Sequence, residues 1–83
     1  MITVLFFAGL REAVGTSSES LALPSEVNTV AALRDHLAGR GDKWSALASA
    51  KNLRAAVNQD MVPLTTAIKD GDEIAFFPPV TGG

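Results

Sequence analysis

Apolar residues fill almost every position of residues 2–7, Ile-Thr-Val-Leu-Phe-Phe. A run so rich in β-branched and aromatic residues is typical of a strand that is buried on both faces and lies centrally in its sheet. Residues 73–77, Glu-Ile-Ala-Phe-Phe, repeat the pattern near the other end of the chain, directly after the turn signal at 70–72, Asp-Gly-Asp. We expect these first and last strands to lie side by side, and the long chain between them allows a parallel pairing.

The segment between these strands contains one clear helical pattern. Val30, Leu33 and Leu37 follow helical spacing after a capping Asn28 or Thr29, which predicts the main helix. The other expected elements are short: helical segments at 10–14 and, capped by Asp42, around 44–48, and strands at 19–23, 53–57 and 61–62. This order predicts an α+β roll of the β-grasp kind, with a mixed sheet and the main helix over one face.

The alternation along the last strand assigns its side chains to two faces of the sheet. If Ile74 and Phe76 point toward the helix, Ala75 and Phe77 point to the opposite face, and Phe7 does the same from the first strand. One main helix cannot cover both faces, so either loops fold over the second face or a partner protein covers it. We expect Phe7, Ala75 and Phe77 to form a partner interface, with Phe77 as its anchor.

The residues after the last strand form a distinct segment. We expect residues 1–77 to fold as one domain and residues 78–83 to form an extended tail. The two prolines fix φ near −65°, which favours extended chain, and the closing Gly82-Gly83 pair removes every side chain from the tip. Such a tail is suited to threading a narrow channel. The residues expected to enter a partner are Pro78, Pro79, Val80, Thr81 and Gly82.

Composition and charge narrow the class of protein. Hydrophobic residues at 47% and charged residues at 19% describe an ordinary globular chain. A net charge of −2 without any basic cluster argues against a nucleic-acid or anionic-membrane surface. The apolar run at residues 4–10 is too short to span a membrane, and no basic segment precedes it. We therefore expect a cytoplasmic protein.

The chain has few side chains that could perform catalysis. It has no cysteine and one histidine, His36, so disulfides, thiol nucleophiles, thiolate metal sites and histidine-rich metal sites are excluded. The serines lack a convincing base, because His36 lies in a polar part of the expected helix. The candidate reactive group is then the terminal carboxylate of Gly83. A carboxylate becomes electrophilic only when activated, for example by adenylation, and any sulfur carried there would be a thiocarboxylate.

Several motifs together resemble a known family. They are Val-Leu-Phe-Phe-Ala at 4–8, Arg11-Glu12, Ala-Val-Asn-Gln at 56–59, Asp-Gly-Asp-Glu at 70–73 and, most specifically, Ala-Phe-Phe-Pro-Pro-Val-Thr-Gly-Gly at 75–83. From end to end the chain is similar to the small, sulfur-carrying subunit of molybdopterin synthase, a family of ubiquitin-like β-grasp proteins.

The resemblance implies a cycle of sulfur transfer. An activating enzyme would use ATP to adenylate Gly83, and a sulfur donor would convert the adenylate to a thiocarboxylate. The tail would enter the large subunit of molybdopterin synthase and give its sulfur to precursor Z, forming the dithiolene of molybdopterin. Two small subunits would flank a dimer of large ones, which would supply the catalytic side chains. The small subunit would then be no enzyme by itself and would hold no permanently bound cofactor or metal.

Two other functions fit the same tail. One is a sulfur carrier for thiamin synthesis or RNA thiolation, and the other is a ubiquitin-like modifier joined to lysines. Co-purification with a pterin-binding large subunit would favour molybdopterin synthase. Isopeptide-linked adducts on cellular lysines would favour the modifier.

Overall fold

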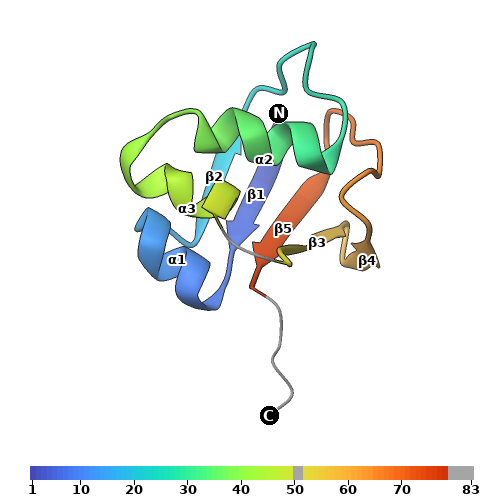
Figure 1. Ribbon diagram of the computed structural model, residues 1–83. Helices are drawn as coiled ribbons and strands as arrows, with labels where there is room; N and C mark the ends of the chain where they lie inside the picture. The colour runs from blue at the N-terminus through green and yellow to red at the C-terminus, as the bar shows by residue number, and fades with distance from the viewer. Residues whose placement is uncertain (50–51, 79–83) are drawn as a thin grey trace.

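The computed structural model describes residues 1–49 and 52–78 of the chain (Figure 1). Helices and strands follow the order expected from the sequence. They are β1 (Ile2–Phe6), α1 (Ala8–Val14), β2 (Ser18–Leu21), α2 (Val30–Ala38), the 3-10 helix η1 (Asp42–Ser45), α3 (Ala46–Ser49), β3 (Arg54–Val57), β4 (Asp60–Val62) and β5 (Glu73–Phe77). The predicted division into a domain of residues 1–77 and a tail of residues 78–83 stays a prediction, because residues 79–83 lie outside the described part.

The five strands form one mixed sheet in the order β2-β1-β5-β3-β4. Strands β1 and β5 pair in parallel, with Leu5 beside Ala75, whereas the other pairs are antiparallel. The expected parallel pairing of the first and last strands is confirmed, and β5 is the middle strand. Because β1 and β5 run in the same direction, β5 finishes at the end of the sheet that lies opposite Met1 (Figure 1).

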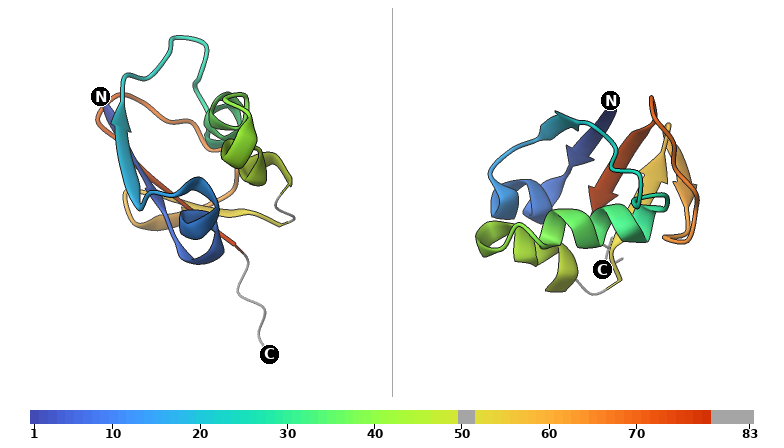
Figure 2. Two further views of the ribbon diagram at one scale, coloured as in Figure 1. Left: turned by 90° about the vertical axis from the view of Figure 1, so that its left-hand side faces the viewer. Right: turned by 90° about the horizontal axis from the view of Figure 1, so that it is seen from above.

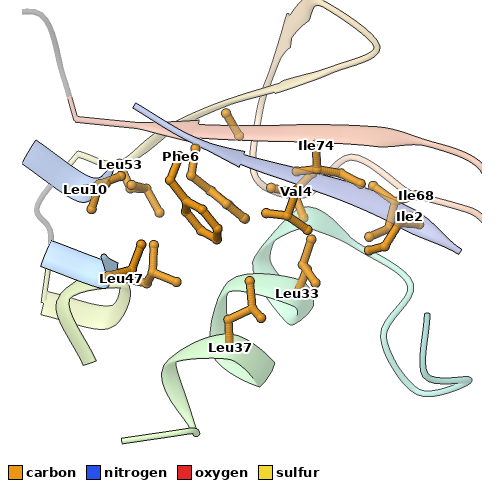
Figure 3. Close-up of a cluster of buried hydrophobic side chains, with 14 of the residues drawn as sticks. Ile2, Val4, Phe6, Leu10, Leu33, Leu37, Leu47, Leu53, Ile68 and Ile74 are labelled. Carbon is orange, nitrogen blue, oxygen red and sulfur yellow. The ribbon is translucent and has the colours of Figure 1, made fainter. Parts of the chain in front are cut away.

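The helices all lie on one face of the sheet, as the views in Figure 2 show. Of the two predicted caps, Asn28 and Thr29, it is Thr29 that caps helix α2: its hydroxyl accepts a hydrogen bond from the Ala32 N–H at 3.1 Å. Its residues Leu33 and Leu37 are fully buried against the sheet (Figure 3). From the sheet, the fully buried side chains facing these helices are Ile2, Val4, Phe6, Ala55, Ile74 and Phe76.

The expectation that β1 is buried on both faces is wrong. Its burial alternates along the strand: Val4 is buried, whereas the neighbouring Thr3 and Leu5 are half-buried. The physical reason is that no helix of the described residues covers the second face (Figure 2). A run that is apolar at almost every position therefore corresponds here to a strand with one buried core face and one open, largely apolar face.

Two turns differ in how well their residues were predicted. Gly15 ends α1 in the left-handed conformation, with φ of 77°, as expected for a helix C-cap. Asp42 was expected to cap the next helix, but it is the first residue of η1, and Gly41 occupies the cap position with φ of 79°. This φ favours glycine over any residue with a side chain.

Asp72 fixes the turn from which β5 starts. Its carboxylate is buried, with 6% of the residue exposed. One oxygen accepts a hydrogen bond from the Asn58 side-chain amide at 3.0 Å, and the other accepts one from the Lys69 backbone N–H at 2.9 Å. Asn58 in turn accepts from the Glu73 N–H at 3.0 Å, so the turn is tied to the β3–β4 hairpin. These bonds, first that from Asn58 and then that from Lys69, lower the pKa of Asp72 from its usual value of 3.8.

Asp72→Asn should destabilise the protein at neutral pH. The new side-chain amide would point its NH₂ group at the Asn58 amide or at the Lys69 N–H, which are both donors, so one hydrogen bond would be lost. The folded-state pKa of Asp72 lies below its unfolded-state value, so its stabilisation is present above about pH 4 and is lost as pH falls through the folded-state pKa. Urea unfolding of both proteins over a series of pH values checks this. The difference in unfolding free energy should shrink as the pH is lowered into the acid range, and a constant difference would contradict it.

Candidate docking face and tail

The open face of the sheet carries an apolar row that crosses four strands. The strand register places Leu5, Ala75, Ala56 and Met61 side by side on this face. Their strand neighbours Val4, Ile74 and Ala55 point to the helix side and are buried. The row is uninterrupted by charge, and it crosses β5 at Ala75, two residues before the strand ends at Phe77.

Phe7 and Phe77 form an aromatic pair at that end. Their ring centroids are 6.5 Å apart and their planes meet at 77°, an edge-to-face arrangement. Phe7 is 46% exposed and Phe77 is half-buried, so the pair retains accessible apolar surface. The Phe7 N–H donates to the Phe76 carbonyl at 3.2 Å, which holds the two chain segments together just before the tail.

The structure places the three predicted interface residues on one face but exposes them unequally. Phe7 and Phe77 have accessible rings, whereas Ala75 is only 8% exposed and lies between Leu5 and Ala56 of the neighbouring strands. Met61 was not predicted, yet it is 61% exposed at the end of the same row. The signal that could have found it is the two-residue alternation in the short segment at 61–62, which sends Val62 inward and Met61 outward.

The tail leaves from the middle of the sheet. Pro78 follows Phe77 directly and is half-buried, at the end of the central strand (Figure 1). The other tail residues predicted to act, Pro79, Val80, Thr81, Gly82 and the reactive Gly83, lie outside the described residues. A terminus that continues from β5 begins beside the Phe7–Phe77 pair, so docking of the open face would bring the start of the tail against the same partner.

The helix side holds a bidentate ion pair between Arg40 and Glu19. Arg40 donates two hydrogen bonds to the Glu19 carboxylate, at 2.9 and 2.5 Å, and its guanidinium lies 4.5 Å from the centre of the Trp44 ring. The hydrogen bonds from Arg40 lower the pKa of Glu19. This cluster joins β2 to the end of α2, so we assign it to the fold and not to a reactive site.

Residues 1–49 and 52–78 contain no grouping of three or more histidines, aspartates or glutamates that could hold a metal ion. His36 is exposed on α2, as expected for a solvated helix residue. None of the helices in these ranges is both long enough and apolar enough to cross a membrane.

Comparison with known proteins places the chain in a family. A model of the ThiS family matches residues 4–83. The molybdopterin synthase sulfur carrier subunit of Escherichia coli is 51% identical over 83 residues, which are 100% of both chains. Small archaeal modifier protein 1 from Methanosarcina acetivorans is 28% identical with a TM-score of 0.76, over 99% of this chain and 95% of that one.

A second solved structure contains a partner. It is the protein-protein complex of subunits 1 and 2 of the molybdopterin-converting factor from Helicobacter pylori. The matched chain is 25% identical with a TM-score of 0.65, over 99% of this chain and 97% of that one.

The mixed sheet with its central parallel strands and one covered face defines a ubiquitin-like β-grasp protein. Within that class the chain belongs to the ThiS family. The resemblance to molybdopterin synthase sulfur carrier subunits that the sequence motifs indicated is confirmed by these matches.

Proposed function

We propose that this chain is the sulfur carrier subunit of a molybdopterin synthase. The observation that carries the proposal is its full-length 51% identity to the Escherichia coli subunit of that name. The structure supports it with an open apolar face whose aromatic end adjoins the start of the tail. Such a carrier needs no catalytic side chain of its own, and the catalytic groups would belong to the large subunit.

The proposed chemistry takes place at the carboxylate of Gly83. An activating enzyme joins this carboxylate to the adenylyl group of ATP and releases pyrophosphate. Sulfide, from a donor system, attacks the acyl carbon and displaces AMP, which leaves a thiocarboxylate. Glycine favours this attack because no side chain shields the acyl carbon. The sulfur then passes to precursor Z, water cleaves the acyl–sulfur bond and the carboxylate returns, and two such transfers complete the dithiolene.

We further propose that the open face docks on the large subunit while the tail enters its active site. The Helicobacter pylori structure, in which the matched chain is complexed with subunit 2, supports a partner of this kind. Two small subunits would flank a dimer of large ones. The exposed ring of Phe7, the half-buried ring of Phe77 and the exposed side chain of Met61 are the contacts that such a partner would cover.

The similarity to small archaeal modifier protein 1 favours one second candidate, a protein modifier. The same activated Gly83 would then be attacked by a lysine amine and would form an isopeptide bond. Proteomics of cells expressing the tagged chain separates the two candidates. Lysine adducts ending in Gly82-Gly83 support the modifier, whereas isolation with a pterin-binding large subunit supports the sulfur carrier.

Incubation with the activating enzyme, ATP and a sulfide source should raise the intact mass by the difference between one sulfur and one oxygen atom. Fragmentation should place this increase at Gly83, because the chain has no cysteine that could hold sulfur. A reaction without ATP is the control and should leave the mass unchanged. Sulfur located on any other residue would contradict the proposed chemistry.

A further inference from the structure

Arg54 is an exposed charged residue at the aromatic end of the open face. The β3–β5 register places it directly opposite Phe77. Its neighbour Ala55 is buried on the helix side, so the alternation along β3 sends the exposed Arg54 to the open face. Cross-strand side chains in direct register lie about 4.5–5.5 Å apart at Cβ, so the Arg54 side chain starts beside Phe77, the last strand residue before the tail, and its guanidinium can reach a partner group there.

The carboxylates of the neighbouring strands lie at the other end of the sheet. Glu73 begins β5, four residues before Phe77, and Asp60 begins β4 opposite Val57. A strand rises about 3.3 Å per residue, so Glu73 is roughly 13 Å from the Phe77 position along β5. Among residues 1–49 and 52–78 the ion pairs involve Met1, Arg34, Arg40 and Lys69, and none involves Arg54.

A groove adjoins Arg54 at the β3–β4 edge of the sheet. Most of its lining is apolar, and it includes Leu53, Arg54, Met61, Val62, Pro63 and Leu64. Arg54 and Met61 belong both to this groove and to the open face, so the two surfaces are continuous. The groove and the open face together place the positive charge of Arg54 beside apolar contact area. The guanidinium of an arginine can bind a carboxylate through two parallel hydrogen bonds.

We infer that Arg54 is a specificity determinant of the docking face and binds a carboxylate that the tail-receiving protein places beside its apolar socket. The inference rests on the proposed function, because it takes the large subunit of molybdopterin synthase as that protein. The apolar row supplies contact area that tolerates sliding along the sheet. A bidentate ion pair next to Phe77 fixes the position and therefore the point at which the tail enters. It also selects against partners with a basic or purely apolar rim.

The test measures binding of the purified large subunit from the same organism by calorimetry at low and high NaCl. Arg54→Glu should weaken binding about tenfold or more at low salt, since like charges then meet at the interface, and high salt should shrink this loss. Arg54→Leu keeps apolar bulk and should show a smaller loss and a weaker salt dependence than the unchanged protein. The matched control is Lys43→Glu, which makes the same change in charge on exposed η1, on the helix side.

The outcomes separate this inference from the proposed function. If Arg54→Glu binds as tightly as Lys43→Glu while the unchanged protein binds well, the role of Arg54 is overturned and the proposed function stands. If the unchanged protein does not bind the large subunit at all, both are overturned. Thermal unfolding of each variant shows whether it is folded, and should Arg54→Glu unfold, the comparison of Arg54→Leu with the unchanged protein over salt decides instead.

Discussion

Adding one alanine after Gly83 should abolish sulfur transfer and leave the melting temperature unchanged. An extended residue spans ~3.3–3.6 Å, whereas catalytic geometry tolerates a misplacement of only about 1 Å before rates fall by about 100-fold. Deleting Gly83 should abolish sulfur transfer as well, because it displaces the reactive carbon by a similar distance in the opposite direction. Stability should be preserved because, of the residues that the structure describes, Phe76 is the last fully buried one, and it lies six positions before Gly82.

Three measurements check this prediction on each variant: thermal unfolding, intact mass after activation, and single-turnover sulfur transfer with the large subunit. Gly82→Val is the matched variant, because it keeps the tail length and adds a branched side chain at its tip. It should also lose charging or delivery of sulfur. Full turnover by the alanine-extended protein, with the added residue shown by mass to be present, would refute the proposed role of tail length.

Phe76→Ala should lower the unfolding free energy by about 3–5 kcal/mol, the usual cost of removing a buried phenylalanine ring. Phe76 is fully buried, and its ring stacks on that of Phe6 with centroids 6.4 Å apart. Phe77→Ala should have a different effect, although the two residues are adjacent. It removes a half-buried ring on the open face and should weaken binding of the large subunit by about 1–3 kcal/mol.

Denaturant unfolding and calorimetric binding, applied to both variants, provide the comparison. Each alanine variant is the control for the other, because each removes one phenylalanine ring from the same strand, β5. A Phe77→Ala protein that loses stability and keeps its affinity would show that the docking face is not where we place it.

The elements with the strongest local signals were predicted well. Thr29 caps α2 as its hydroxyl allows, and the alternation of Ile74 and Phe76 assigned the correct face of β5. The burial of β1 was predicted wrongly, because an apolar run reports hydrophobicity and not which of its two faces a helix covers. Gly41 was overlooked as a cap, because only the folded turn reveals its positive φ.

The candidate site was predicted in part. Phe7 and Phe77 follow from alternation and lie in contact as an aromatic pair. Met61 and Arg54 were not predicted. The alternation at 61–62 could have assigned Met61 to this face, whereas the place of Arg54 opposite Phe77 depends on the pairing of β3 with β5, which the residues of β3 alone do not reveal. The roles of Pro79 to Gly83 rest on the sequence and remain predictions.

The placement of β5 between β1 and β3 has a consequence for how the molecule folds. Leu5 and Ala75 are neighbours in the sheet but 70 positions apart in the chain. Closing so long a loop costs conformational entropy before any contact compensates for it, so we expect slow, highly cooperative folding. A nascent chain that has not yet emerged through β5 lacks the middle of its sheet. The docking face therefore forms only after β5 has left the ribosome, by which time residues that follow β5 in the chain have already been added.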